Sequence, residues 1–347
     1  MGLVLISMAF WVWVLRRLSA PQTYIWGMVA AVVLGIFAVH IILPLGHPAR
    51  EALGGTLRPW GILAGFGVIV WLYTRLLSEI RQRSASVPDD DTPKGPFSTT
   101  ELDRYARHIV LREIGGGGQQ RLKMAKVLVV GAGGLGAPIL QYLAAAGVGQ
   151  IGMIDKDVVC LSNLQRQVLF NEDDLEQPKV LAAARHLSLL NPNLEFRPYN
   201  RHLDANIAAD LLGDYDLVLD GTDDFATRAL VNATCVRLGL PLVSGAISQW
   251  EGQVTVVDSA AGTPCMHCLF PKEPAKGTAS TCAEGGVLGA LPGIIGSIMA
   301  AEAIKLITGA GAVLKGRMLI YDALYAETRI IDVARRTDCI VCGSKVK

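Results

Sequence analysis

The residues best suited to chemistry in this sequence are a run of glycines, an acid and two cations. Gly131-Ala132-Gly133-Gly134-Leu135-Gly136 is followed by Asp155 and then by Arg166 and Lys179. Glycines at this spacing let the backbone turn tightly and approach a phosphate, and an acid after the next strand can hold ribose hydroxyls. The two cations can offset phosphate charge. The pattern predicts a nucleotide site; a plain glycine-rich turn and ordinary surface charge are the alternatives.

A second acid, Asp223, stands where a magnesium ligand is expected. It follows the apolar run Leu217–Asp220, with Gly221 and Thr222 between. Ligands of open parallel sheets bind beyond the carboxyl ends of the strands, and Mg²⁺ is commonly held by one or two carboxylates together with substrate phosphates. No Ser-His-Asp or Cys-His arrangement is evident. The pattern favours a transfer at a phosphate, where positioning and charge stabilisation do most of the catalysis.

Two Cys-x-x-Cys pairs, Cys265-Met266-His267-Cys268 and Cys339-Ile340-Val341-Cys342, predict a structural zinc site. Each pair supplies two thiolates at the spacing of a zinc knuckle, and four thiolates close a tetrahedral shell with no open position. His267 is then expected to be a neighbour of the metal and not a ligand. Redox pairs or disulfides are the alternatives, but a protein that binds a cytosolic nucleotide is expected in a reducing compartment.

Three cysteines lie outside these pairs. Cys282 sits in a polar, glycine-containing segment, Ser280–Gly286, where a thiol can be a nucleophile. No nearby His or Lys indicates an activated thiolate, so an inert thiol is the alternative. Cys160 and Cys235 have no partner in the sequence and are expected to be small core residues.

Strands and helices alternate through the part of the chain that carries these residues. Val127–Val130 and Ile151–Ile154 are short apolar runs typical of buried parallel strands, and a helix is predicted between them from Ala137 to Ala146. Further strands are predicted at Leu217–Asp220 and Pro241–Gly245. The predicted fold is α/β, a Rossmann-like and mostly parallel sheet with helices on both faces.

The first 83 residues are predicted to form a transmembrane region of two or three helices. Gly2–Leu15, Tyr24–Leu45 and Trp60–Leu72 contain no Lys, Arg, Asp or Glu, and the second is long enough to span a bilayer, which takes ~20 residues. A cleaved signal peptide is the alternative for the first run, but its arginines follow the apolar stretch. Gly285–Ala301 is also uncharged; its Gly, Ala and Pro content favours a buried helix or a subunit contact.

The positive-inside rule orients the predicted spans. Arg16 and Arg17 follow the first run, and Arg75, Arg81 and Arg83 follow the third, so both groups are expected on the inner side. The chain is then a multi-pass protein of the inner (cytoplasmic) membrane with its catalytic part in the cytoplasm. Residues 84–97, rich in Ser, Pro and Asp, are interpreted as a flexible linker, and residues 98–347 as the catalytic domain.

Composition limits the partners. The chain has 347 residues, with 32 Lys and Arg against 31 Asp and Glu, and its net charge is +1. This balance gives no electrostatic basis for nucleic-acid binding.

From Leu102 to Gly343 the chain resembles the E1-like adenylyltransferases of the MoeB/ThiF/HesA group, and its MoeB members most. The residues before Leu102 lie outside the resemblance. The stretches that carry it are, in order, Arg104-Tyr105-Ala106-Arg107-His108-Ile109, Gly131 to Gly136, Ser162 to Gln167, Gln177-Pro178-Lys179, Asp220 to Asp223, Val243-Ser244-Gly245, Glu251-Gly252-Gln253, Thr281-Cys282 and both cysteine pairs.

The resemblance implies an enzyme with an E1-like fold that uses ATP and Mg²⁺. Its expected substrate is the C-terminal Gly-Gly carboxylate of a small ubiquitin-like sulfur-carrier protein, which attacks the α-phosphate and gives an acyl-adenylate and pyrophosphate. Asp155 would hold the ribose, Asp223 the magnesium, and Asn163, Arg166 and Lys179 would contact phosphates. The glycine turn and Thr222 complete the expected nucleotide-binding set, which is Gly131, Gly133, Gly134, Leu135, Gly136 and Thr222.

The resemblance also implies a homodimer, in which Arg107 reaches into the site of the partner subunit. Where the family usually has Asn after the magnesium-binding acid, this chain has Asp224, which leaves one polar contact in question. The sequence ends soon after Cys342 and has no rhodanese domain, so another protein is expected to load the sulfur.

Two other classes of function, and two carriers, remain as alternatives. A nicotinamide dehydrogenase on the same fold would explain the glycines and Asp155 but would leave Arg166, Lys179 and Asp223 without a use. A non-catalytic membrane scaffold predicts losses among the phosphate-contacting residues, and none is seen. Within the adenylyltransferase interpretation, a MoaD-like carrier for molybdopterin synthesis is favoured over a ThiS-like carrier for thiamine synthesis.

Overall fold

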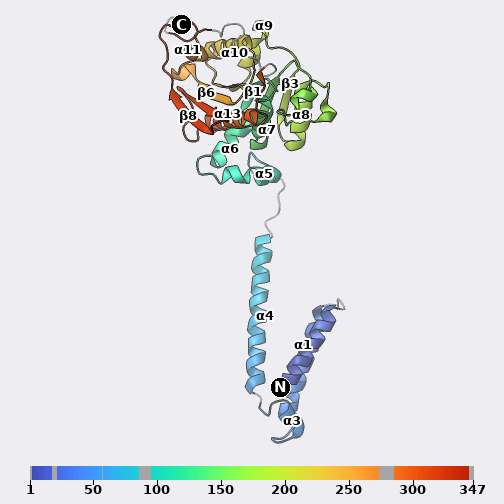
Figure 1. The fold of residues 1–347 in the computed structure, drawn as a ribbon. Helices are drawn as coiled ribbons and strands as arrows, with labels where there is room; N and C mark the ends of the chain where they lie inside the picture. Colours follow the sequence, from blue (N-terminus) through green and yellow to red (C-terminus); the bar gives the residue numbers. More distant parts are fainter. Residues whose placement is uncertain (1, 18–21, 57, 86–94, 273–284, 344–347) are drawn as a thin grey trace. The chain divides into compact units, whose positions relative to one another are not determined.

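The structure of the chain is a computed structural model that describes residues 2–17, 22–56, 58–85, 95–272 and 285–343 (Figure 1). The chain divides into two compact units, residues 1–92 and 93–347. Cys282 and the central part of the predicted linker lie outside the described residues.

Within the described residues, eight strands of the second unit form one sheet in the order β3-β2-β1-β4-β5-β6-β7-β8. The five strands from β3 to β5 in this order are parallel, and β6, β7 and β8 join by antiparallel pairs. From β1 the chain first adds β2 and β3 on one side and then continues with β4 and β5 on the other side. The ligand crevice of such a sheet is expected at this switch point. The strands are β1 Lys126–Val130, β2 Gln150–Ile154, β3 Glu195–Tyr199, β4 Leu217–Asp220, β5 Leu242–Ile247, β6 Glu251–Val257, β7 Arg317–Asp322 and β8 Glu327–Asp332.

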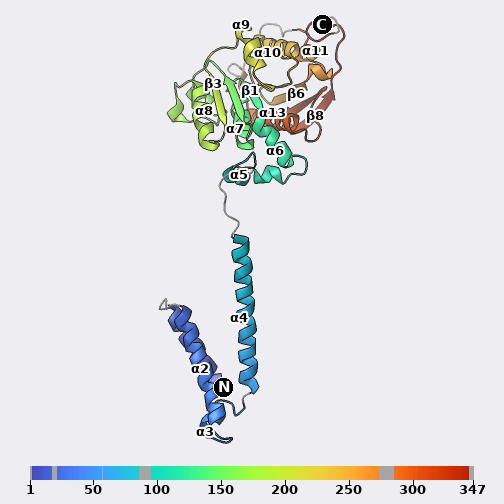
Figure 2. The ribbon, with the colours of Figure 1, turned by 180° about the vertical axis from the view of Figure 1, so that it is seen from behind.

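Helices cover both faces of the parallel half of the sheet (Figures 1 and 2). On one face pack α7 (Gly136–Ala146), α8 (Lys179–Leu190) and α13 (Leu291–Thr308), and on the other α9 (Ala205–Gly213) and α10 (Phe225–Leu238). Alternate residues of β1 enter the two cores, because successive side chains of a strand point to opposite faces. The α/β class and the helices on both faces are as predicted from the sequence.

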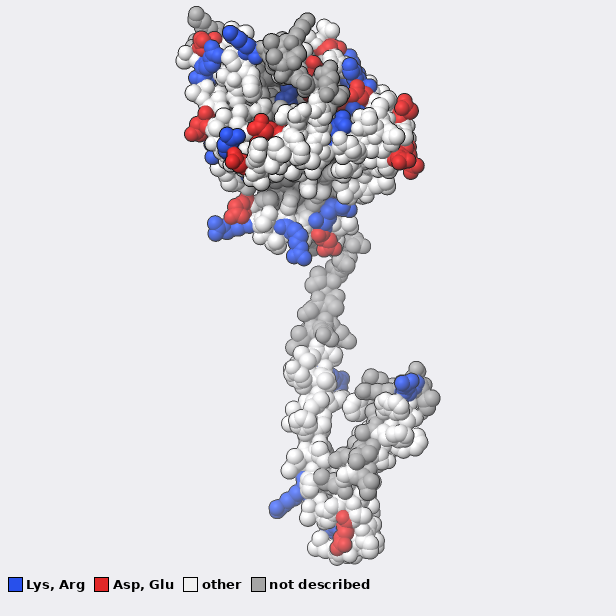
Figure 3. Space-filling model, in the orientation of Figure 1, with Lys and Arg blue, Asp and Glu red and all other residues white. Residues whose placement is uncertain are grey.

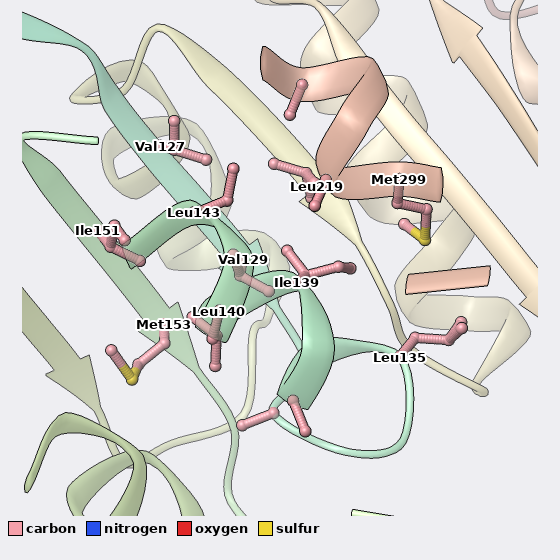
Figure 4. Close-up of a cluster of buried hydrophobic side chains, with 14 of the residues drawn as sticks. Val127, Val129, Leu135, Ile139, Leu140, Leu143, Ile151, Met153, Leu219 and Met299 are labelled. Atoms are coloured by element: carbon pink, nitrogen blue, oxygen red, sulfur yellow. The ribbon is translucent and has the colours of Figure 1, made fainter. Parts of the chain in front are cut away.

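The core on the α7 side fixes the helix that follows the glycine turn (Figure 4). Leu140 and Leu143 of α7 belong to one buried cluster with Val129, Ile151 and Met153 of the strands, and all five are 0% exposed. Burial of one such side chain contributes about 1.5–3 kcal/mol. The N-terminus of α7 is therefore held at the C-terminal end of β1.

Within the described residues of the second unit, two helices precede the sheet, α5 (Thr99–Ile109) and α6 (Gly115–Met124). A capping box starts α5, because the Ser98 hydroxyl accepts from the Glu101 N–H and the Glu101 carboxylate accepts from the Ser98 N–H. Helix α6 begins with four consecutive glycines, Gly115–Gly118, although glycine has a low helix propensity. Gly118 packs closely there, since a Cβ would lie 2.9 Å from Cγ2 of Ile114.

The antiparallel half of the sheet differs most from the sequence prediction. The sequence predicts a mostly parallel sheet, whereas β6, β7 and β8 add three antiparallel pairs at one edge. Helix α13 is the uncharged stretch that resembles a membrane span, and half of its most apolar window is buried. Ile295, Met299 and Ala303 are fully buried in the core shared with β5 and β6. The buried-helix interpretation is thus confirmed, with a start at Leu291 and not at Gly285.

The first unit consists of apolar helices, α1 (Gly2–Arg17), α2 (Gln22–Ile42) and α4 (Arg58–Ala85), with the short α3 (Pro48–Ala52) between the last two. They overlap the three predicted apolar runs, and α4 extends two residues beyond residue 83. Arg58–Glu79 is long and apolar enough to cross a membrane, and its most apolar window is 0% buried; the apolar part of α2 is shorter. The visible face of this unit carries few charged side chains (Figure 3).

Candidate active site and cysteine cluster

The glycine turn lies where three parallel strands end. The Gly131 N–H donates to the Ile154 carbonyl at 2.9 Å, and the Gly221 N–H donates to the Val130 carbonyl at 3.0 Å, so the ends of β1, β2 and β4 meet. Gly136 must lack a side chain, because a Cβ would lie 1.9 Å from the Gly131 carbonyl oxygen. No side chain caps α7. The first N–H groups of this helix therefore suit a phosphate.

Asp155 ties the glycine turn to the end of β2. One carboxylate oxygen accepts from the Ala132 N–H and the other from the Asp157 N–H, both at 2.8 Å. The side chain is half-buried and keeps acceptor capacity on both oxygens. An acid held in this position can accept hydrogen bonds from ribose hydroxyls.

Arg166 and Asn163 lie beside the turn on one short segment. A Cβ on Gly134 would lie 3.9 Å from Cδ of Arg166 and 3.1 Å from Cβ of Pro292. The Arg166 guanidinium donates to the Ser162 carbonyl at 3.1 Å, and the Asn163 amide oxygen accepts from Gln167 at 3.3 Å. The structure thus brings Arg166 to the glycine turn, where a guanidinium can contact phosphate oxygens.

Lys179 begins helix α8 and points its ammonium at Asp157. Nζ lies 3.0 Å from Asp157 Oδ2, and the lysine side chain is 6% exposed against 55% for the aspartate. Asp157 is two residues after Asp155, so Lys179 is linked to the ribose-side acid through a short stretch of chain. The contact between Lys179 and Asp157 thus joins two residues that are 22 positions apart in the sequence.

Thr222 and Asp223 follow β4 on the other side of the turn. A Cβ on Gly131 would lie 3.3 Å from Cγ2 of Thr222, whose N–H and hydroxyl both donate to Asp220 Oδ1. Asp223 is exposed. Asp224, the departure from the family pattern, caps α10 by accepting from the Thr227 N–H and hydroxyl, and these bonds lower the pKa of its carboxyl. Asn also favours this capping position.

The set could hold a magnesium ion as well as a nucleotide. The exposed carboxylate of Asp223 lies at the same strand end as the turn, and hard carboxylate oxygens suit Mg²⁺. By contrast, Arg107 lies exposed in the last turn of α5, and among the described residues no hydrogen bond or ion pair joins it to this site. Cys282 cannot be placed, because it lies outside the described residues.

The four paired cysteines form a compact cluster on the α10 side of the sheet. All four are buried, and their sulfurs lie within 4.8 Å of one another. The Cys265–Cys339 and Cys268–Cys342 sulfur distances are 3.7 and 3.4 Å, too long for S–S bonds of about 2.05 Å. Sulfurs around a tetrahedral zinc with Zn–S bonds of about 2.3 Å are about 3.8 Å apart. The donor set and its spacing fit zinc.

The thiols of this cluster are not equivalent. Burial raises the pKa of Cys265 and Cys268. Burial opposes ionisation of Cys339 as well, but hydrogen bonds from the Cys342 and Val341 N–H groups outweigh it and bring the pKa of that thiol to about 7. One sulfur is thus prepared to bind a metal as thiolate, which is the form that ligates.

Three residues near the site were not singled out from the sequence. Gln167 is 3% exposed with its Oε1 unpaired among the described residues, and its Nε2 would lie 3.7 Å from a Cβ on Gly133. Arg228 donates to the Thr222 carbonyl at 2.9 Å and also to the Gly245 carbonyl. Asp157 pairs with Lys179. Asp157 and Arg228 contact residues 22 and 17 positions away in the sequence, and Gln167 lies beside the glycine turn.

Comparisons with known proteins agree on this part of the chain. The ThiF family model matches residues 105–341. A "Sulfur carrier protein adenylyltransferase" of Thermus thermophilus is 50% identical over 254 residues, 72% of this chain and 93% of that protein. The bovine "Adenylyltransferase and sulfurtransferase MOCS3" is 46% identical over 271 residues, 78% of this chain but 59% of that protein.

A solved structure shows the same fold. The crystal structure of E. coli MccB with MccA-N7isoASN matches with a TM-score of 0.62 and 23% identity, over 70% of this chain and 75% of that chain. At this identity the likeness concerns the fold alone.

Proposed function

Because this chain belongs to the ThiF family, we propose that it activates a ubiquitin-like sulfur-carrier protein by adenylation. The C-terminal carboxylate of the carrier attacks the α-phosphorus of ATP and forms a new O–P bond. The bond between the α-phosphorus and the oxygen that bridges it to the β-phosphate breaks. Pyrophosphate leaves with that electron pair. A carboxylate is already ionised at pH 7, so the reaction needs no general base from the protein.

The residues of this chain supply positioning and positive charge. The glycine turn and the N-terminus of α7 receive phosphate, Asp155 receives the ribose, and Arg166 and Lys179 neutralise oxygens of the triphosphate. Asp223 would hold Mg²⁺, which when bound neutralises phosphate charge. The meeting of the turn with Asp155, Arg166 and Thr222 at one sheet edge carries the proposal.

The test is ATP–pyrophosphate exchange that depends on a carrier ending in Gly-Gly. We expect exchange with the unsubstituted chain and loss of at least about 100-fold in Asp223→Ala and in Arg166→Ala, because each removes a charge that faces the phosphates. Lys156→Ala is a matched control, since this exposed neighbour of Asp155 has no part in the proposed site. Full exchange in both variants would refute the site.

We further propose a MoaD-like carrier and a role in molybdopterin synthesis, with a ThiS-like carrier as the second candidate. The support is the resemblance of the motifs to MoeB members. Exchange with purified MoaD-like and ThiS-like carriers in parallel separates the two, and a higher kcat/KM with the ThiS-like carrier would overturn the preference.

We also propose that the first unit anchors the enzyme in the cytoplasmic membrane. Large apolar side chains of α4, such as Ile62 at 75% and Phe66 at 66%, are exposed, and surface of this kind needs a cover. Arg17 stacks on Trp13 and Arg75 on Trp71, pairs suited to the headgroup region. The homodimer with Arg107 shared between subunits is likewise a proposal, supported by the family resemblance and the exposed position of Arg107.

A further inference from the structure

Lys179 owes its position to a small ladder between two segments of chain. The Lys179 N–H donates to the Asp157 carbonyl at 2.9 Å, the Val159 N–H to the Gln177 carbonyl at 2.9 Å, and the Glu176 N–H to the Val159 carbonyl at 3.0 Å. An antiparallel bridge joins Val158 to Pro178. The residues after β2 and those before α8 are thereby bound to each other along their length.

The side chain of Lys179 has less freedom than a surface lysine. It is 6% exposed, and within the described part of the chain Asp157 is the carboxylate that pairs with it, at 3.0 Å. A buried cation needs a partner with charge, since water no longer solvates it. Without Asp157 the ammonium would have to move to solvent, away from the position it now holds.

The same carboxylate residue is tied to the ribose-side acid. The Asp157 N–H donates to Asp155 Oδ1, and the other oxygen of Asp155 accepts from Ala132 in the glycine turn. The backbone of Asp157 is thus fixed by the group that faces the ribose, while its side chain fixes the lysine. Asp157 therefore contacts both the acid proposed to receive the ribose and the lysine proposed to face the phosphates.

We propose that Asp157 is a positioning residue for ATP, because it holds the Lys179 ammonium where a triphosphate can reach it. The inference rests on the proposed use of ATP. Asp157 is itself 55% exposed, so water screens its repulsion of phosphate, whereas the buried lysine depends on it. Loss of the ordered cation therefore outweighs relief of the repulsion, and ATP binds more weakly without the aspartate.

Equilibrium titration of the detergent-solubilised full chain with Mg-ATP tests this inference. We expect Asp157→Asn to weaken binding about tenfold, the usual scale for loss of a supporting contact. Asp157→Glu, which keeps the charge, should lose less than the isosteric Asn. If only the size and shape of the side chain mattered, Asp157→Asn would bind Mg-ATP more tightly than Asp157→Glu. Asp173→Asn, an exposed acid of the neighbouring turn, is the matched control and should bind normally.

A double-mutant cycle completes the test. In a Lys179→Ala background, Asp157→Asn should change Mg-ATP binding by less than about twofold, because the group it positions is gone. Equal losses in both backgrounds, unchanged binding in Asp157→Asn, or no binding by the unsubstituted chain would each overturn the inference. If binding behaves as expected but no carrier supports exchange, the inference stands and the proposed carrier activation fails.

Discussion

The carboxylate of Asp174 is fully buried and makes contacts in three directions. Its oxygens accept from the Asn171 N–H at 2.9 Å, from the His186 ring at 2.8 Å and from Arg185. Burial by itself raises the pKa of this carboxyl, but the Asn171 N–H, His186 and Arg185 outweigh it and place the pKa below its ordinary value. The turn that leads to Lys179 is fixed by these bonds.

Asp174→Asn is therefore expected to lower the free energy of unfolding by about 3 kcal/mol, the scale for removing one member of a buried ion pair. A carboxyl whose folded pKa is depressed adds stability above its unfolded pKa of about 3.9 and loses it as the pH falls through the folded value. Urea unfolding at several pH values should show the difference between the two proteins shrinking below about pH 4.

Asp173→Asn is the control for this prediction, because Asp173 is exposed, and we expect a change within about 0.5 kcal/mol. A gap between Asp174→Asn and the unsubstituted protein that stayed constant down to low pH would contradict the ionised-carboxylate explanation.

At the scale of elements, the four-cysteine cluster connects α11 (Met266–Leu269) to the C-terminal segment and to α10. Cys265 and Cys339 belong to the same buried cluster as Val231 and Cys235 of α10, and the Met266 N–H donates to the Asn232 amide oxygen at 3.0 Å. The cluster thus supports the helix whose first turn follows Asp223. Loss of the metal should affect the fold before it affects the chemistry.

Cys268→Ser is expected to reduce bound zinc from about one ion per chain to nearly none, because three thiolates leave the shell incomplete. Metal analysis and thermal unfolding measure the effect, and the melting temperature should fall together with the zinc content. Cys160→Ser, a half-buried cysteine outside the cluster, should keep both values. Zinc retained in full by Cys268→Ser would rule out the four-cysteine site.

The elements differ in how far the sequence predicts them. The parallel strands and α7 follow from continuous apolar runs and a helix closed by Gly147, whose φ of 84° ends it. The direction of β6 and the pairing of β7 with β8 depend on partners far along the chain, which no local pattern encodes. Helix α6 forms despite four glycines because tertiary packing overrides propensity.

The same distinction applies to the site. The glycine turn, Asp155 and Asp223 are recognisable because each stands at a strand end, where position alone indicates a role. Asp157, Gln167 and Arg228 act through contacts that only the folded chain creates. The residue types of Asp157 and Arg228 are common on surfaces, so the sequence offers no sign that separates these two from solvated neighbours, whereas Gln167 ends the recognisable stretch Ser162–Gln167.

At the scale of the whole molecule, a homodimer with shared sites makes a sharp prediction. Arg107→Ala and Asp223→Ala should each be inactive in carrier-dependent exchange, but a mixture refolded or co-expressed together should recover activity. In a mixed dimer, one site has an intact Asp223 and receives Arg107 from the partner subunit. Random pairing of equal amounts then gives about one quarter of the full activity.

The same mixture gives no recovery if Arg107 acts within its own chain, since every site would carry one defect. A mixture of Asp223→Ala and Arg166→Ala serves as the control and should show no recovery. Both residues belong to the site of their own chain, so each site of a mixed dimer lacks one of them. The exchange activity of each mixture is measured at equal total protein concentration and compared with the activity of each variant alone.

The apolar first unit predicts the behaviour of the full chain in cells. We expect the protein to sediment with membranes, to stay there at alkaline pH and high salt, and to be released by detergent, because its apolar helices are exposed within the chain. Immunoblots of the fractions measure this, with a peripheral membrane protein as control. Release by alkaline carbonate alone would contradict a spanning anchor.

The cysteine cluster sets an order on biosynthesis. Each sulfur contact joins residues 74 positions apart, so the second pair leaves the ribosome only after most of the domain has emerged. Until then the buried cluster that includes residues of α9 and α10 lacks Cys339 and Cys342. Binding of a metal by the four thiolates at the end of translation would then complete this core.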